Sequence, residues 1–203
     1  LDFFGETLTV WNVGQGQWVT FVGFETCLHF DAGGERLPIF QISRACRHKK
    51  NEIYLSHGDL DHISGVRRLS RWPRVCRRQD PLGELTLNKK KMLHSVPFCI
   101  GQTHTPSPTR LFPLGDELNR QGPRQNSNSS SIVWLYKGWI LPGDSTTREE
   151  KIWSERIRKN SVRGIIIGHH GSQTSSSEQL IQALGNFRQA AVSARWIRYK
   201  HPH

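Results

Sequence analysis

Seven residues that follow a short apolar run constrain this chain more than any other part of it. The segment reads SHGDLDH and comes directly after Ile53–Leu55, a run that predicts a buried strand. It holds two imidazoles and two carboxylates, which are His57, Asp59, Asp61 and His62. Charged groups at the end of a buried strand need a partner, because burying them unpaired is costly. A divalent cation suits this set of side chains, so the segment predicts a metal-binding turn between a strand and a helix.

Two further groups of polar residues stand at the ends of predicted strands. Asp144 follows the run Trp139–Leu141, and His169 and His170 follow Ile165–Ile167. A lone carboxylate after a strand is often a helix cap, and a lone histidine is often a satisfied core group. Three such clusters, each placed after a strand, favour a common chemical function over three unrelated structural roles.

Apolar periodicity predicts a mixed α/β chain. Strands are expected at 7–13, 19–24, 27–31, 52–55, 131–136, 139–141, 162–167 and 190–194. Helices are expected at 39–46 and at 63–69, the second with a basic outer face. A third helix is expected to start at Thr146 or Thr147, with an acidic residue that completes a capping box. A fourth is expected to start at a Ser175 cap and to end at Gly185. Segment 73–126 contains Lys89–Lys91 and several prolines, and it is expected to be an exposed crossover or insertion.

The composition excludes several classes of protein. With 203 residues, 35% of them hydrophobic and 22% charged, the chain has enough apolar side chains for a core and is neither disordered nor fibrous. The longest apolar stretch, 131–141, is interrupted by Lys137 and is too short to span a membrane. The sequence starts without Met or a signal-like segment, so we expect a domain cut from a longer protein.

The charge balance favours an anionic partner. The net charge of +11 suits a phosphate-rich molecule or an anionic lipid surface, although a merely soluble basic surface stays open. The four cysteines, Cys27, Cys46, Cys76 and Cys99, lie far apart without CxxC spacing, so a cysteine zinc site is not expected. They allow three disulfide pairings in an oxidising compartment or four free thiols in a reducing one.

The strand-end clusters resemble those of the metallo-β-lactamase superfamily, in which an HxHxDH loop, a later Asp and a later His bind two metals. Here Asp59 stands where the second His of that loop would be. Together with further segments in the same order, this HxDxDH form resembles the C-terminal metallo-β-lactamase-like domain of the ComEC family of DNA-uptake competence channels. These segments are Val13–Gly16, Asp31–Gly34, Asn128–Val133, Gly143–Asp144, His169–Ser172 and Arg198–Pro202, and the resemblance runs from Phe3 to His203.

This resemblance implies a fold and a set of metal ligands. The fold is an αββα metallo-β-lactamase sandwich, two mixed β-sheets flanked by helices, formed by a single domain over residues 1–203. His57 and Asp59 would hold one metal, while Asp61 and His62 would hold the second, with Asp144 bridging and His169 completing the second site. Asp31 would orient a ligand from behind the loop.

The resemblance also implies roles in catalysis and substrate binding. The implied catalytic groups are Asp61, Asp144 and His170, and the implied substrate contacts are Asn128, Ser131, Ser172 and His201. A solvated terminal histidine is an equal alternative for His201. Two divalent cations about 3.5–4 Å apart can share a hydroxide and neutralise a phosphodiester under attack. Three carboxylates against three imidazoles favour Mn²⁺, with Mg²⁺ or Zn²⁺ as alternatives.

Basic residues after the metal loop and near the C-terminus suit a nucleic-acid strand. They are Arg67, Arg68, Arg71, Arg74, Arg77 and Arg78 in one group, and Arg195, Arg198 and Lys200 interleaved with Trp196 and Tyr199 in the other. We therefore expect non-sequence-specific, salt-sensitive binding of single-stranded or duplex DNA.

The implied function is metal-dependent hydrolysis of DNA, specifically of the strand that is not imported during natural transformation. The domain would lie on the extracytoplasmic face (periplasmic or outer) of the bacterial cytoplasmic membrane, joined to the rest of the channel protein and not itself inserted. A non-catalytic DNA-binding module of the channel and a small-molecule hydrolase on the same fold are the alternatives. Asn12, Gln17 and Gln173 depart from the family's motifs but leave the implied ligands intact.

Overall fold

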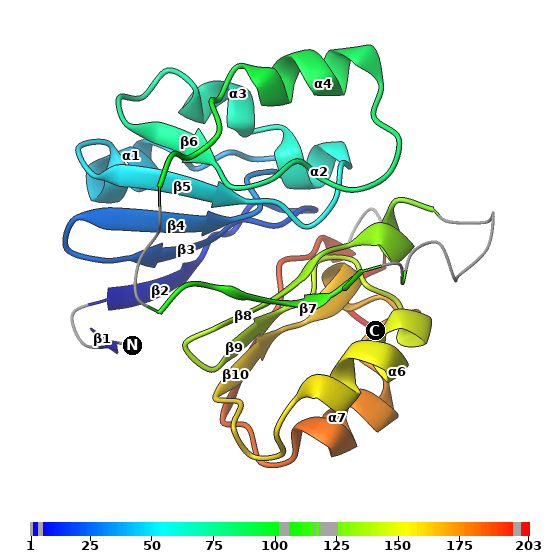
Figure 1. The fold of residues 1–203 in the computed structure, drawn as a ribbon. Helices are drawn as coiled ribbons and strands as arrows, with labels where there is room; N and C mark the ends of the chain where they lie inside the picture. Colours follow the sequence, from blue (N-terminus) through cyan, green and yellow to red (C-terminus); the bar gives the residue numbers. More distant parts are fainter. Residues whose placement is uncertain (1, 4–5, 102–105, 116, 118–125, 197–199) are drawn as a thin grey trace. The chain divides into compact units, whose positions relative to one another are not determined.

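The computed structural model describes residues 2–3, 6–101, 106–115, 117, 126–196 and 200–203. The chain divides into two compact units, residues 1–101 and 102–203, and each is a β-sheet with helices (Figure 1). This confirms the predicted mixed α/β class. The single domain expected over 1–203 stays a prediction.

The first unit is built on a six-stranded sheet in sequential strand order. Its strands are β1 (Asp2–Phe3), β2 (Glu6–Val10), β3 (Val19–Val22), β4 (Thr26–Phe30), β5 (Lys50–Tyr54) and β6 (Val75–Arg77). The pairs from β1 to β4 are antiparallel, whereas β4, β5 and β6 run parallel. Phe30 pairs with Tyr54, so the carboxyl ends of β4 and β5 lie side by side. The loops that carry Asp31 and His57 therefore start next to each other.

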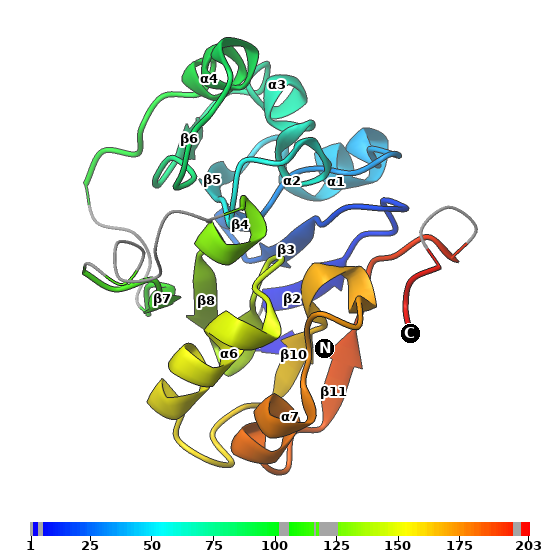
Figure 2. The same cartoon turned by 90° about the vertical axis from the view of Figure 1, so that its right-hand side faces the viewer.

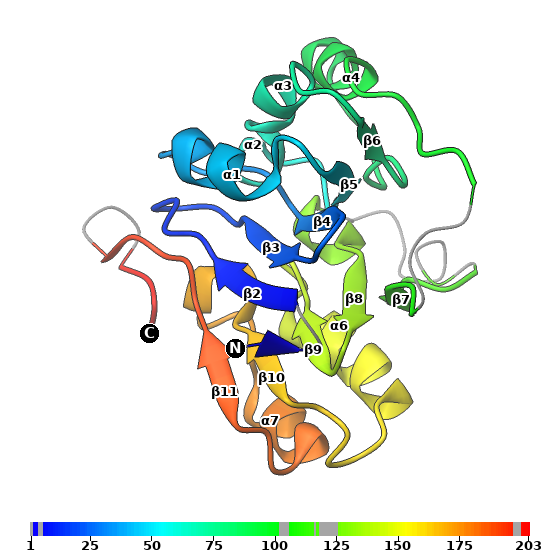
Figure 3. The ribbon, with the colours of Figure 1, turned by 90° about the vertical axis from the view of Figure 1, so that its left-hand side faces the viewer.

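Four helices lie on the same side of this sheet (Figure 3). They are α1 (Ile39–Cys46), α2 (Leu60–Ile63), α3 (Val66–Leu69) and α4 (Leu87–His94). The core between helices and sheet contains Trp18, Ile42, Ile53, Ile63 and Leu69, all fully buried. Burial of such large apolar side chains is the main source of stability in a unit of this size.

The helix expected at 63–69 is wrong in one respect: it is two short helices, broken at Gly65. The Gly65 amide donates a hydrogen bond of 2.6 Å to the carbonyl of Ala32. A Cβ atom on Gly65 would lie 2.5 Å from the ring of Trp18, so only glycine allows this close approach. The break is a tertiary effect that helical periodicity does not reveal.

The middle segment is more ordered than the expected crossover. It contains β6 and α4, and α4 starts at Thr86, whose hydroxyl accepts a hydrogen bond from the Lys89 amide. Residues 89–91 therefore lie in a helix. The strand β7 (Thr109–Phe112) belongs to the second unit, and part of the Pro-containing stretch, 102–105, lies outside the described residues.

Disulfides join all four cysteines within the first unit. Cys27 of β4 bonds Cys46 of α1, and Cys76 of β6 bonds Cys99. The sequence left three pairings and the reduced state open, and this is the pairing found. The first bridge is fully buried in the core, whereas Cys76 and Cys99 are half-buried.

The second unit is built on a five-stranded sheet in the order β11-β10-β9-β8-β7. Its other strands are β8 (Val133–Tyr136), β9 (Trp139–Leu141), β10 (Gly164–Ile166) and β11 (Gln189–Ala191). Strands β7, β8 and β9 are antiparallel, while β9, β10 and β11 are parallel, so β11 lies beside β10 (Figure 3). The predicted hairpin through Lys137 and Gly138 is confirmed.

Two helices, α6 (Thr147–Trp153) and α7 (Glu178–Leu184), cover one face of this sheet (Figure 2). Three short 3₁₀ segments, η1 (Asn128–Ser130), η2 (Ser154–Arg156) and η3 (Gly168–Gly171), join the elements. The capping box predicted for α6 is present, with Thr146 as the N-cap and Glu149 as its partner. The cap of α7 is Ser177 and not the predicted Ser175, whose hydroxyl instead donates to the Gly168 carbonyl.

Among the described residues, every helix is too short or too polar to span a lipid bilayer.

Candidate metal-binding site

The carboxylate of Asp31, at the end of β4, organises the loop after β5. Its Oδ1 accepts a hydrogen bond of 2.7 Å from the Ser56 amide, and its Oδ2 accepts from the Ser56 hydroxyl at 2.7 Å and from Gln17 Nε2 at 3.0 Å. His62 Nδ1 lies 2.8 Å from the same Oδ2. Because an ionised carboxylate only accepts, the Nδ1 atom of His62 carries the proton. The Nε2 atom of His62 then presents a lone pair, which is the form that binds a metal.

His57 is oriented in the same way through Ser56. The Ser56 hydroxyl donates its proton to Asp31, so it accepts from His57 Nδ1 at 3.0 Å. The His57 Nε2 atom is left as a lone-pair donor and lies 3.6 Å from Asp59 Oδ2. Both imidazoles are fully buried, and their ring centroids are 4.1 Å apart. This donor set fits a divalent cation, since neutral imidazoles with fixed Nδ1 protons are typical metal ligands.

The two aspartates of the loop differ in their surroundings. Asp61 lies in the first turn of α2 and is half-buried. The Asp59 side chain is 35% exposed, and its Oδ1 lies 3.3 Å from the Nζ atom of Lys89 on α4. Lys89 was not among the predicted site residues, because 30 positions separate it from Asp59.

Glycines beneath this loop let two backbone segments approach closely. A Cβ atom on Gly33 would lie 2.4 Å from the Asp61 carbonyl carbon, and one on Gly16 would lie 2.4 Å from Gly34 Cα. Gly16 also has a φ of 135°, which favours glycine. The two glycine-containing segments noted in the sequence, Val13–Gly16 and Asp31–Gly34, therefore pack closely against each other and against the backbone of the metal-binding loop.

In the second unit, Asp144 follows β9 and is buried. Its amide donates a 3.2 Å hydrogen bond to Ser131 Oγ, and Ser131 is itself fully buried. Since Thr146 is the N-cap of α6, Asp144 does not have the helix-cap role that was its alternative. Ser131 was expected to contact phosphate, and its buried hydroxyl holds the backbone of Asp144 instead.

His169 and His170 follow β10 with left-handed backbone, at φ values of 45° and 53°. Two consecutive non-glycine residues in this region are uncommon and are often found at functional sites. His170 is 3% exposed, its Nδ1 hydrogen-bonds the Ser193 carbonyl at 3.0 Å, and its Nε2 lies 3.6 Å from Asp144 Oδ1. The carbonyl fixes the proton on Nδ1 and directs the Nε2 lone pair towards Asp144.

His169 has a different environment from its neighbour. Its Nε2 is 3.2 Å from the Asn128 side-chain amide and 4.0 Å from Asp144 Oδ2, and its Nδ1 is 2.9 Å from Thr174 Oγ1. The side chain is 24% exposed. Of the two histidines, His170 thus has the more buried side chain, and its Nε2 lies closer to an Asp144 oxygen.

His201 is half-buried and lies within a cluster of imidazoles. Its ring centroid is 6.2 Å from that of His169 and 5.2 Å from that of His203. Burial, followed by the neighbouring histidines, lowers the pKa of His201, and Asp144 partly opposes the effect. His201 is therefore partly shielded from solvent, and its role as a substrate contact stays a prediction. Ser172, the remaining expected substrate contact, is half-buried with its Oγ 3.1 Å from Thr174 Oγ1.

The predicted basic faces are only partly available to a ligand. Arg67, Arg68, Arg71 and Arg74 are exposed. Arg78 instead forms two hydrogen bonds with the fully buried Glu52, at 2.8 and 3.0 Å, and Arg77 is buried and paired with Asp80. Arg77 and Arg78 therefore stabilise the first unit, which corrects their expected role. Near the C-terminus, the Lys200 Nζ atom lies 5.9 Å from the exposed Trp196 ring, while Arg198 and Tyr199 lie outside the described residues.

Comparison with solved structures decides the fold. The chain superposes on the crystal structure of a diphosphatase from the PhnP family with a TM-score of 0.51, at 14% identity, over 89% of this chain and 74% of that one. The chain has the metallo-β-lactamase fold. The two mixed sheets with flanking helices, predicted from the resemblance, are confirmed.

Sequence comparison adds relatives of this metallo-β-lactamase-fold chain among competence and recombination proteins. It is 26% identical to ComE operon protein 3 of Bacillus subtilis over 84% of this chain and 23% of that protein. It is 24% identical to competence protein ComA of Neisseria gonorrhoeae, over 96% and 28% of the two chains. It is 36% identical to recombination protein 2 of Haemophilus influenzae, over 95% and 25%.

These relatives belong to the ComEC family, so the similarity noted in the sequence is confirmed at the level of sequence likeness. The chain spans about a quarter of the length of each of them. No family model matches the chain.

Proposed function

We propose that this chain is a metal-dependent phosphodiesterase that hydrolyses DNA, acting on the non-transported strand during natural transformation. One observation carries the proposal: His57 and His62 are buried with their Nδ1 atoms hydrogen-bonded through Ser56 and Asp31, so both Nε2 atoms present lone pairs. Neutral imidazoles whose Nδ1 proton is fixed in this way are typical ligands of a divalent cation.

The proposed ligands all follow strands in the sequence. His57, Asp59, Asp61 and His62 follow β5, Asp144 follows β9, and a histidine of the 169–170 pair follows β10. Bound divalent cations, with Mn²⁺ favoured by the carboxylate content, would lower the pKa of a bound water and neutralise phosphate charge. Asp31 keeps the ligand His62 in the correct tautomer, and Ser131 fixes the backbone that carries Asp144.

Support for DNA as the substrate comes from charge and from the relatives. A net charge of +11 attracts a polyanion, whereas a small neutral substrate gains nothing from it. Two of the relatives are named as a competence protein and a recombination protein. Competence and recombination both involve DNA. The attached partner would be the rest of the channel protein.

The disulfides support an extracytoplasmic position. Both pairs of cysteines are bridged, and structural disulfides persist in oxidising compartments and are rare in the cytosol. This agrees with a location on the outer or periplasmic face of the cytoplasmic membrane.

The direct test is cleavage of end-labelled single-stranded and duplex DNA with Mn²⁺, Mg²⁺, Zn²⁺ or EDTA. We expect metal-dependent cutting that Asp61→Asn abolishes, while Asp80→Asn, the same change at a partly exposed residue outside the proposed ligand set, retains it. Tight DNA binding without cutting under any metal would overturn the enzyme and leave a DNA-binding module. Hydrolysis of a small phosphoester without cutting of DNA would instead point to a small-molecule hydrolase.

A further inference from the structure

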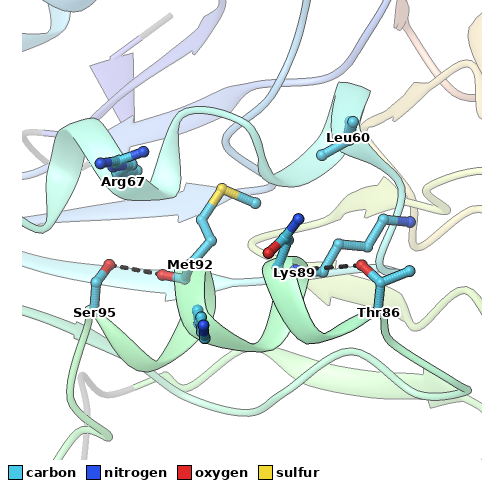
Figure 4. A pocket seen from close by; sticks show the side chains of 8 residues that line it. Leu60, Arg67, Thr86, Lys89, Met92 and Ser95 are labelled. Atoms are coloured by element: carbon cyan, nitrogen blue, oxygen red, sulfur yellow. Dashed lines mark hydrogen bonds between the residues drawn. The ribbon is translucent and has the colours of Figure 1, made fainter.

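A cavity of about 790 Å³ lies in the first unit between α4 and the pair α2 and α3 (Figure 4). We call it the α4 groove. Its lining residues are Leu60, Arg67, Thr86, Asn88, Lys89, Lys91, Met92 and Ser95. The sequence assigned no function to α4, which lies in the segment expected to be an exposed insertion.

The α4 groove combines cations with apolar surface. Arg67, Lys89 and Lys91 contribute positive charge, and none of the described residues that line the groove is acidic. Leu60 and Met92 contribute apolar surface, and 59% of Leu60 is exposed although it is a large aliphatic residue. A ligand that matches this lining is anionic along its backbone and has flat apolar faces.

The α4 groove adjoins the metal-binding loop within the same unit. Leu60 stands in the chain between Asp59 and Asp61, and Lys89 contacts the Asp59 carboxylate across 3.3 Å. In Figure 4, Leu60 and Lys89 lie at the same end of the groove. A ligand in the groove therefore lies beside the proposed metal ligands. Lys89 already pairs with Asp59, so Arg67 and Lys91 are the cations left for phosphates.

We propose that the α4 groove binds a short stretch of unpaired nucleic-acid strand, with Arg67 and Lys91 on its phosphates and a base against Leu60 and Met92. An unpaired strand exposes the faces of its bases, whereas a duplex buries them by stacking. Arg67 and Lys91, together with the hydrogen-bonding groups of Thr86 and Asn88, also suit a nucleotide better than a lipid chain. The inference rests on the proposed function in one respect only, namely that the strand continues from the groove towards the metal-binding loop.

The first test measures binding without catalysis. Fluorescence anisotropy of a labelled oligothymidine is recorded in EDTA over a salt series, with the 203-residue chain. Arg67→Ala/Lys91→Ala is compared with Arg47→Ala/Lys90→Ala, which removes the same charge from exposed positions outside the groove. Each phosphate contact with a single strand contributes about 0.7 to the slope of log K against log salt. We expect the groove variant to lower the slope by about 1.4 and the affinity by more than tenfold, and the control to change neither by as much.

The second test examines the apolar surface. Leu60→Ser leaves the charge unchanged, so we expect weaker oligothymidine binding at an unchanged salt slope and no effect on duplex binding. Equal loss for strand and duplex would overturn the assignment to an unpaired strand. Parental affinity in both the Arg67→Ala/Lys91→Ala and Leu60→Ser variants would overturn the groove itself.

A third measurement separates this proposal from the proposed function. Bis(p-nitrophenyl) phosphate has a single phosphate, which the metal-binding loop can hold without a strand in the groove, so its metal-dependent hydrolysis at saturating substrate should be unchanged in Arg67→Ala/Lys91→Ala. If the parent chain does not hydrolyse this substrate but still binds the strand through the groove, only the proposed enzymatic function would be refuted. Hydrolysis in the parent with strand binding indifferent to the groove would refute only the groove.

Discussion

His62 Nδ1 and Asp31 Oδ2 are 2.8 Å apart, and this contact joins the last residue of the SHGDLDH segment, in α2, to the residue that follows β4. Asp31 accepts from Ser56 and Gln17 as well, so one carboxylate fixes both the backbone of the loop and the tautomer of a proposed ligand. Because Asp31 and Ser56 follow adjacent parallel strands, the sheet itself brings them together.

Replacing Asp31 by Asn should weaken metal binding more than it weakens the fold. The amide would turn a donor towards His62 or Ser56, so the Nδ1 proton would lose its acceptor. Loss of such an outer partner typically costs about 10- to 100-fold in metal affinity. Titration calorimetry with Mn²⁺ measures it, with Asp80→Asn as the control. Unchanged Mn²⁺ affinity in Asp31→Asn would show that His62 needs no such support.

Gln17→Glu should lower stability although it is nearly isosteric. Gln17 is buried and donates from Nε2 to Asp31 at 3.0 Å, so the variant would place a second carboxylate against the first. A lost hydrogen bond and like-charge repulsion should reduce the free energy of unfolding by about 1–3 kcal/mol in metal-free protein. Urea unfolding measures the change, and Gln182→Glu, at an exposed position, should alter it little. Equal midpoints for the parent and Gln17→Glu would contradict this role.

Sequence could predict those parts of the site that consist of polar side chains at the ends of strands. His57, Asp61 and Asp144 follow strands that apolar periodicity locates well. The contacts made by backbone atoms were beyond reach, because the Ser193 carbonyl that orients His170 leaves no signature in residue type. The Lys89 contact to Asp59 also depends on how α4 packs, and no local pattern encodes that packing.

Much of the fold could be predicted for similar reasons. The prediction was wrong where contacts between distant parts of the chain determine the local structure. The strands and the capping box of α6 follow from local patterns, which the structure confirms. The break at Gly65 depends on Trp18, a residue far away in the chain. Disulfide pairing likewise requires β4 and α1 to be packed together, which spacing alone does not show.

His29 should make the stability of the chain depend on pH. It is fully buried, its Nδ1 accepts from Trp18 Nε1 at 3.2 Å, and its Nε2 donates to Asn51 Oδ1 at 3.0 Å. Burial lowers the pKa of His29 to about 4, with the bond to Asn51 opposing the effect. The unfolded chain binds this proton below pH 6.5 and the folded chain does not. Stability is therefore full above pH 6.5 and is lost as the pH falls towards 4, by roughly 3 kcal/mol.

Urea unfolding at pH 7, 5.5 and 4.5 measures this loss. His29→Gln keeps a donor and an acceptor but does not titrate, so its stability should fall less over the same range. Parallel pH profiles for the parent and His29→Gln would assign the acid sensitivity to other groups.

The two disulfides should differ in how readily they are reduced. Cys27 and Cys46 are fully buried, whereas Cys76 and Cys99 are half-buried. A reductant should therefore open Cys76–Cys99 first, which mass spectrometry detects after thiol alkylation. Each bridge closes a loop of moderate length, with separations of 19 and 23 residues, and should contribute about 2–4 kcal/mol. Reduction of Cys27–Cys46 before Cys76–Cys99 would contradict this order.

His169→Ala and His170→Ala separate the two neighbouring histidines. The resemblance implied His169 as a metal ligand and His170 as a catalytic group. In the structure, however, His170 is the more buried, with its Nε2 0.4 Å closer to an Asp144 oxygen, at 3.6 Å against 4.0 Å. His169 Nε2 instead accepts from Asn128. We therefore expect His170→Ala to lose Mn²⁺ affinity by about tenfold or more, as for a ligand. His169→Ala should keep that affinity and slow DNA cleavage, and Asn128→Ala should resemble it. The reverse order of Mn²⁺ affinities would return the ligand role to His169.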